Sequence, residues 1–80
     1  MFKRTIVVMD GSDLKKVYKI IGIVEMLAFN RSKVKMESLD AAHPTTKVIK
    51  FKSTRTDYNL IKEIIETDYP ALCSFGMQYH

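Results

Sequence analysis

The alternation of hydrophobic and polar positions predicts four strands along the chain. Residues 2–9 end in four consecutive apolar side chains, which is typical of a central strand with apolar groups on both faces. Residues 33–39 and 46–53 alternate in polarity, which predicts two half-buried strands joined by a turn at residues 40–44. Residues 71–79 also alternate and predict a last strand.

Two other segments show the 3.6-residue period of helices. The first follows Ser12, a favourable N-cap residue, and runs to about Phe29. The second begins near Thr56, whose hydroxyl can cap it. It ends at Tyr69, because Pro70 disfavours helical geometry in the residue before it. The chain is therefore expected to run strand, helix, strand, strand, helix, strand.

This order predicts one α+β domain over residues 1–80, with the ferredoxin-like βαββαβ topology. In this topology a four-stranded antiparallel sheet has the strand order 4-1-3-2. Right-handed crossovers place both helices on one face of the sheet. The first strand then lies in the middle of the sheet, as its two apolar faces suggest.

The first helix is apolar around most of its circumference, which indicates burial on more than one side. The stripe expected to lie on the sheet consists of Leu14, Val17, Ile21 and Val24. A second, rotated set consists of Ile20, Ile23 and Leu27. We expect the second helix to cover only part of that set, and the remainder to form the interface of a homodimer. Gly22 is expected to be either a tolerated small residue or a point of close backbone approach.

Charge is distributed unevenly, although the net charge of +4 is only mildly basic. Residues 1–56 carry twelve basic and five acidic side chains, whereas residues 57–80 carry one basic and four acidic ones. A protein polarised in this way can bind an anion at one end, an acidic partner or another copy of itself.

The clearest candidate site is a cluster of basic side chains around the predicted hairpin, able to follow phosphates without reading bases. The cluster consists of Arg31, Lys33, Lys35, Lys47, Lys50, Lys52 and Arg55. If Ile49 and Phe51 face the helices, Lys50 and Lys52 lie on the open face of the sheet, beside Lys33 and Lys35. The alternative is a solvated edge, because lysines commonly protect exposed strands from aggregation.

The expected topology resembles that of RNA recognition motifs, which stack bases on aromatic side chains of the two central strands. The segment Lys50-Phe51-Lys52 offers one aromatic ring, expected to face inward, and residues 5–9 offer none. We therefore expect a non-enzymatic protein that associates with RNA through lysines. The competing class is a protein-binding regulator or inhibitor, of the small accessory kind found in phages and mobile elements.

A second resemblance involves Asp10, which follows the first strand and precedes Ser12, Asp13 and a basic helix start. This opening resembles that of the Cas2-like small nucleases, ferredoxin-like dimers with an aspartate at the end of their first strand. The family's second-strand pattern is missing here. The resemblance implies that Asp10 would hold a divalent metal at the dimer axis. A turn formed by Asp10 and Gly11 is the alternative.

The remaining residues predict no metal, cofactor or catalytic group. His43 lacks the partners of a catalytic base, and the two histidines and Cys73 have no zinc-ligand spacing. As a single cysteine, Cys73 cannot form an internal disulfide, which fits a reducing, cytoplasmic location. No apolar run approaches the roughly 18 residues of a membrane span, so we expect no contact with a membrane.

Overall fold

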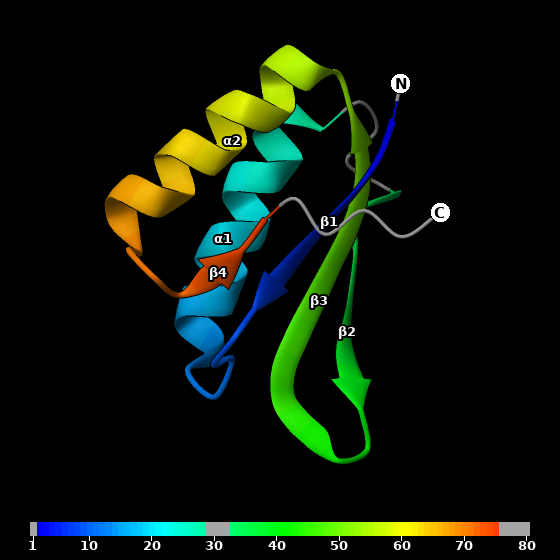
Figure 1. The fold of residues 1–80 in the computed structure, drawn as a ribbon, viewed down its shortest axis with the longest axis vertical. Coiled ribbons are helices and arrows are strands. Elements are labelled where there is room, and N and C mark those ends of the chain that lie inside the picture. The colour runs from blue at the N-terminus through cyan, green and yellow to red at the C-terminus, as the bar shows by residue number, and fades with distance from the viewer. Residues whose placement is uncertain (1, 29–32, 76–80) are drawn as a thin grey trace.

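The computed structural model describes residues 2–28 and 33–75. Its elements are β1 (Phe2–Val8), α1 (Leu14–Leu27), β2 (Lys35–Asp40), β3 (His43–Ser53), α2 (Arg55–Asp68) and β4 (Cys73–Ser74). The strands form one antiparallel sheet in the order β2-β3-β1-β4, and both helices lie on one side of it (Figure 1). The predicted ferredoxin-like α+β arrangement and its strand order are confirmed.

β1 and β3 form the centre of the sheet, paired from Phe2 opposite Ser53 to Val8 opposite Lys47. Successive side chains of a strand point to opposite faces of the sheet. Accordingly, Ile49 and Phe51 of β3 are buried on the helix side, whereas Lys50 and Lys52, which have the opposite parity, are exposed. The predicted orientation of β3 is therefore confirmed.

The core lies between the sheet and the two helices. From α2 it contains Tyr58, Ile61 and Ile65, and from α1 it contains Val17, Ile20 and Val24. The predicted sheet-facing stripe is wrong at Leu14, which is exposed, and at Ile21, which is only half-buried. Ile20 is completely buried within the chain, so its predicted place in a subunit interface is wrong. Ile23 and Leu27 are half-buried and pack against the core.

The N-cap of α1 lies one residue later than predicted. Asp13 is the N-cap, and its Oδ1 accepts a hydrogen bond from the backbone N–H of Lys15 at 3.1 Å. Ser12 instead donates both its backbone N–H and its hydroxyl to Oδ1 of Asp10. Both residues have the chemistry of a cap, but Ser12 is engaged by the turn before the helix.

α2 begins earlier than predicted. Thr54 is the N-cap, and its Oγ1 accepts a hydrogen bond from the backbone N–H of Asp57 at 3.1 Å. Thr56 lies within the first turn, so the prediction that it caps the helix is wrong. The helix ends at Asp68 and is followed by Tyr69 and Pro70, as predicted.

The hairpin between β2 and β3 is tighter than predicted. Its turn contains only Ala41 and Ala42, because Asp40 pairs with His43. β3 therefore includes Pro44, which the sequence placed in the turn. The tip of this hairpin reaches beyond the helices, at the bottom of Figure 1.

The two glycines for which the structure gives the surroundings have different roles. Gly11 donates its backbone N–H to the carbonyl oxygen of Thr45 at 2.6 Å. A β-carbon at Gly11 would lie 2.8 Å from this oxygen and would overlap the Lys47 side chain, so the loop after β1 depends on glycine here. At Gly22, a β-carbon would meet no atom within 4 Å, which makes it a tolerated small residue within the chain.

β4 is short in the described part of the chain. It pairs with β1 only at Val7–Ser74 and Val8–Cys73. Ala71, in the turn before it, has a φ of 62°, a left-handed conformation unfavourable for a residue with a β-carbon. Residues 76–79 of the predicted last strand, Phe29 and Arg31 lie outside the described residues.

Candidate nucleic-acid interface

The sheet face opposite the helices carries lysines on three neighbouring strands. Lys35 of β2 lies directly opposite Lys50 of β3, and Lys52 of β3 lies directly opposite Lys3 of β1. Directly opposed side chains of antiparallel strands share a face, with β-carbons about 4.5–5.5 Å apart. We call these four exposed residues the lysine face: Lys3, Lys35, Lys50 and Lys52.

The lysine face is only partly neutralised. Lys50 Nζ donates to Oε1 of Glu37 at 2.6 Å. This hydrogen bond, together with the charge of Lys50, holds the pKa of Glu37 below its ordinary value of 4.5. Among the described residues, Lys3, Lys35 and Lys52 make no ion pair. The face therefore keeps most of its positive charge, and each cross-strand pair brings two like charges together.

Other members of the predicted cluster lie elsewhere. Lys47 is on the helix-bearing face, where its Nζ donates to Ser38 Oγ at 3.0 Å and to the carbonyl oxygen of Pro44 at 2.9 Å. Arg55 begins α2, on the same side of the sheet as the helices. Lys33 is exposed just before β2. The structure thus brings together Lys35, Lys50 and Lys52 from the predicted set, but neither Lys47 nor Arg55.

Lys3 is a member of the lysine face that the sequence interpretation missed. The expected strand order already placed β1 beside β3, and Lys3 alternates with the residues of β1 that face the helices. Pairing the two strands in register would have placed it opposite Lys52. No pattern within the hairpin points to Lys3, because Lys3 lies on a strand that is distant in the sequence.

The central strands place no aromatic ring on this face in the described part of the chain. The open-face positions of β1 beside Lys3 are Thr5 and Val7, and that of β3 beside Lys50 is Val48. Phe51 is buried on the helix side, as expected. Base stacking of the kind used by RNA recognition motifs therefore has no platform on these two strands.

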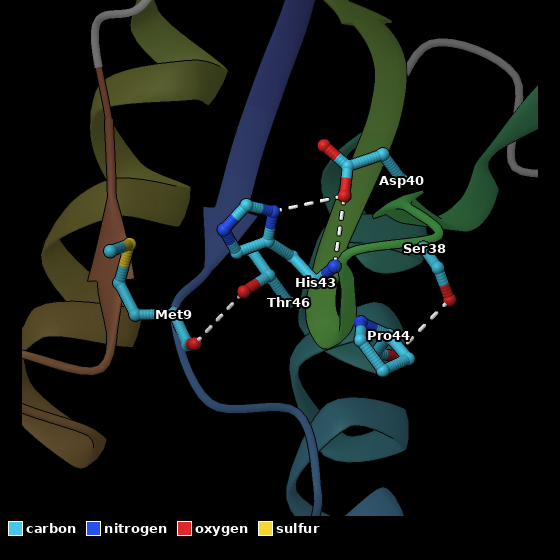
Figure 2. Close-up of polar contacts among 6 residues, drawn as sticks. All are labelled: Met9, Ser38, Asp40, His43, Pro44 and Thr46. Carbon is cyan, nitrogen blue, oxygen red and sulfur yellow. Dashed lines mark hydrogen bonds and ion pairs between the residues drawn. The ribbon is translucent and has the colours of Figure 1, made fainter.

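The hairpin tip holds the histidine considered as a possible base. Nδ1 of His43 lies 2.9 Å from Oδ1 of Asp40, and the backbone N–H of His43 donates to the same oxygen at 2.8 Å (Figure 2). These hydrogen bonds hold the pKa of Asp40 below its ordinary value of 3.8. Nearby, Oγ1 of Thr46 donates to the carbonyl oxygen of Met9 at 3.4 Å. These contacts close the turn and anchor the hairpin to the loop after β1.

Asp10, the candidate metal ligand, is engaged within its own turn. The hydroxyl of Ser12 donates to Oδ1 of Asp10 at 2.7 Å, and the backbone N–H of Ser12 donates to it at 3.1 Å. These two bonds hold the pKa of Asp10 below its ordinary value of 3.8. Residues 2–28 and 33–75 contain no group of three or more His, Cys, Asp or Glu side chains able to hold a metal ion. The Cas2-like hypothesis stays a prediction, which metal-dependent cleavage lost in Asp10→Ala would test.

Cys73 is a half-buried thiol beside Val8 on the edge of the sheet. Burial raises its pKa to about 11, so the thiol is protonated at neutral pH. Because the thiolate is the reactive form of cysteine, Cys73 is a poor nucleophile in this environment.

Comparisons of the chain with protein-family models, with curated proteins and with solved structures found no match. A function for this chain is therefore inferred from its own residues. None of the helices in the described part of the chain is long and apolar enough to cross a membrane.

Proposed function

We propose that this protein is a non-enzymatic nucleic-acid-binding protein that associates with RNA through the lysine face. The observation that carries the proposal is the arrangement of its lysines in two directly opposed cross-strand pairs, Lys35 with Lys50 and Lys3 with Lys52. Like charges opposite each other destabilise a sheet. A line of phosphates placed over the face relieves this repulsion and gains attraction from both pairs.

The expected ligand is a single strand. Phosphate contacts position a nucleic acid but carry no sequence information, so we expect weak sequence preference. Exposed sheet surfaces with basic side chains follow the backbone of single strands, and binding of this kind weakens steeply with salt. An RNA-associated role also fits the cytoplasmic location predicted from the single cysteine.

The test is binding of a labelled single-stranded RNA to the protein between about 50 and 200 mM salt. The informative variant is Lys35→Glu/Lys52→Glu, because each new carboxylate faces a remaining lysine, Lys50 or Lys3. The sheet should therefore stay intact while phosphate binding is lost. In the single variants, the slope of log affinity against log salt should fall by about 0.7 per lysine removed.

The matched control is Lys15→Glu/Lys19→Glu on the exposed surface of α1, which changes the net charge by the same amount. It should retain most of the RNA affinity. Equal loss of binding in both double variants would mean that net charge alone attracts the RNA. Absence of binding by the unchanged protein at low salt would contradict the proposal. A duplex DNA of the same length, measured in parallel, distinguishes single-strand from general phosphate binding.

A second candidate function is protein binding, and a feature of α1 favours it. Leu14, Tyr18 and Met26 are 49%, 61% and 82% exposed. Their spacing of four and eight residues places them in one row along the helix, with Gly22 between the last two. Exposed apolar rows of this kind commonly contact other proteins. This row lies on a different side of α1 from Ile20, Ile23 and Leu27. It is the better candidate for the contact surface of the proposed homodimer or of a complex with a regulatory target.

Met26→Asp tests this second function, with Leu60→Asp on α2 as the control because Leu60 is also exposed. If the row binds a second copy, light scattering at high micromolar concentration should show a dimer that Met26→Asp alone converts to monomer. If it binds another protein, a pull-down after nuclease treatment should recover one partner with the unchanged chain and with Leu60→Asp. Identical behaviour of all three proteins in both assays would remove this candidate.

A further inference from the structure

Arg4 is a buried cation on the helix-bearing face of β1, with 7% of its surface exposed. Its guanidinium carbon lies 4.7 Å from the ring centroid of Tyr58 and 5.1 Å from that of Phe2. Such cation–π contacts stabilise the charge but do not bind the N–H groups at its edge. Among the described residues, none accepts a hydrogen bond from Nε or Nη2 of Arg4.

These two nitrogens are significant because they belong to the same edge of the guanidinium group. That edge presents two parallel N–H donors, the geometry that binds a phosphate or a carboxylate through two hydrogen bonds at once. Buried charges and buried donors are normally paired, so an arginine that keeps this edge free is an exception that requires an explanation.

Arg4 also lines an open cavity at one end of the molecule. The cavity has a volume of about 320 Å³ and is lined by Phe2, Arg4, Arg55, Tyr58 and Asn59. Figure 1 shows that β1 and α2 begin at this same end. Since one water molecule occupies about 30 Å³ of liquid, the space is sufficient for a phosphate group with part of its substituent.

The cavity wall is strongly positive. It is lined by two arginines and by no acidic residue. Arg55 is the first residue of α2, so the positive end of the helix dipole adds to this charge. Asn59, one turn further along, supplies an amide that can donate a hydrogen bond. Asp57 lies in the same first turn but is not part of the cavity wall.

We infer that this cavity, which we call the arginine pocket (Phe2, Arg4, Arg55, Tyr58 and Asn59), binds a phosphate group. Two arginines without an acidic neighbour in the wall match a dianion better than the single charge of a carboxylate. Nε and Nη2 are closed to solvent in the free chain, so the Arg4 side chain rotates toward the cavity when the ligand enters. Side-chain rotations of this size are common at binding sites.

The inference goes beyond the proposed RNA association, because the arginine pocket lies on the other side of the sheet from the lysine face. Two sources can supply the phosphate: a small phosphorylated molecule, or the terminal phosphate of a nucleic acid. The chemistry at Arg4 is the same for both.

The direct test is a titration of the arginine Nε–H groups by ¹H–¹⁵N magnetic resonance, with inorganic phosphate as the probe. Ionic strength is held constant with sodium chloride. The Arg4 resonance, assigned by its loss in Arg4→Lys, should move and saturate at about millimolar phosphate. Acetate at equal concentration should leave it in place. Equal affinity for acetate, or no saturable movement with phosphate, would overturn the inference.

Variants give a second, independent readout. Phosphate should raise the melting temperature of the unchanged chain, and Arg55→Gln should need about tenfold more phosphate for the same rise. Arg4→Lys keeps the charge but lacks the parallel donors, so it should lose the response altogether. Lys15→Gln, on α1, should respond as the unchanged chain does. If Arg4→Lys does not fold, Arg55→Gln still decides the question, because an unchanged response in that variant would overturn the inference.

Nucleotide probes separate the two sources of phosphate. Adenosine 5′-monophosphate should move the Arg4 resonance, and adenosine should not. A short RNA with a 5′-phosphate should move it further along the same path if the pocket takes a strand terminus, and an RNA without that phosphate should have no effect. Because the lysine variants leave the pocket intact, failure of the RNA proposal does not alter the phosphate titration.

Discussion

The two faces of β3 are built from alternating residues and differ in chemistry. On the helix side, Ile49 and Phe51 are buried in the core. On the open side, Lys50 and Lys52 are exposed, and each faces another lysine on a neighbouring strand. One face contributes the burial that folds the domain, whereas on the other face we expect opposed lysines to repel each other. Placing like charges opposite each other is unfavourable in a small domain, which favours a binding role for the open face.

The cations of the two faces differ in the same way. The lysines of the open face are hydrated point charges that can move to follow a flexible backbone. Arg4, on the helix side, lies over the rings of Phe2 and Tyr58. Its guanidinium group holds its donors in a planar arrangement relative to one another. We therefore expect weak, salt-sensitive binding at the lysine face and geometrically selective binding in the arginine pocket.

The largest contrast is expected from truncating neighbouring residues of β3. Ile49→Ala should lower the free energy of unfolding by about 2–5 kcal/mol, because it removes a completely buried side chain and leaves a cavity. Lys50→Ala should change it by only about 0.5 kcal/mol, as is usual for surface positions. Urea denaturation of the two variants measures both values. Similar losses in the two variants would show that the faces are not energetically distinct.

Substituting alanine for each of two glycines should change the stability by smaller amounts and in opposite directions. Gly11→Ala should destabilise the protein by about 1–3 kcal/mol, because the new methyl group meets the backbone of Thr45 and the side chain of Lys47. Gly22→Ala, on the outer side of α1, should stabilise it by about 0.5–1 kcal/mol, because the site is open and alanine favours the helix. Thermal unfolding should show the two melting temperatures on either side of that of the unchanged chain.

The fold could be predicted from periodicity because the hydrophobic pattern of each helix or strand is visible in its own residues. Alternation in β3 separates Ile49 from Lys50 without any knowledge of the partner strands. The helix caps could not be fixed, because neighbouring residues such as Ser12 and Asp13 have the same capping chemistry. The buried stripe of α1 was also ambiguous, because a helix that is apolar on two sides does not reveal which side meets the sheet. Ile20 is the residue at which that ambiguity led to an error.

Only those residues of the candidate site that follow from the alternation within one strand could be predicted. Three lysines of the lysine face follow from the alternation in the hairpin, but Lys3 needs the register between β1 and β3. Arg4 was missed because a basic residue near the start of a strand resembles a flanking charge. A signal was present, since Arg4 shares its parity with Ile6 and Val8 and must therefore face the helices. The ring of Tyr58 and the second arginine, Arg55, come from α2, which is distant in the sequence, so no local pattern around Arg4 reveals them.

Removing one lysine of an opposed pair should stabilise the protein slightly. Lys52→Gln should raise the free energy of unfolding by about 0.2–1 kcal/mol, because it relieves the repulsion with Lys3 across the strands. The gain should disappear at about 1 M salt, where charges are screened within about 3 Å. Lys15→Gln on α1 is the control and should show no gain at either salt concentration. A loss of stability in Lys52→Gln at low salt would mean that the opposed lysines do not repel each other.

The smallest effect concerns Glu37, whose carboxylate is paired with Lys50 of the lysine face. The pKa of Glu37 is held below 4.5, first by the hydrogen bond from Lys50, then by the charge of Lys50, and last by the charge of Lys35. A lowered pKa in the folded state means that the contact stabilises the fold above pH 4.5. This contribution is lost as the pH falls through the lowered pKa.

Lys50→Met should therefore raise the pKa of Glu37 to near its ordinary value, whereas Lys35→Met should raise it only slightly. Magnetic resonance of the Glu37 side-chain carboxyl carbon measures both directly. Equal shifts in the two variants would mean that the general field of the lysine face, and not a specific hydrogen bond, sets the pKa. In that case Lys50 would be as available to a phosphate as the other three lysines. A shift confined to Lys50→Met would instead mean that a phosphate has to displace Glu37 before it can bind Lys50.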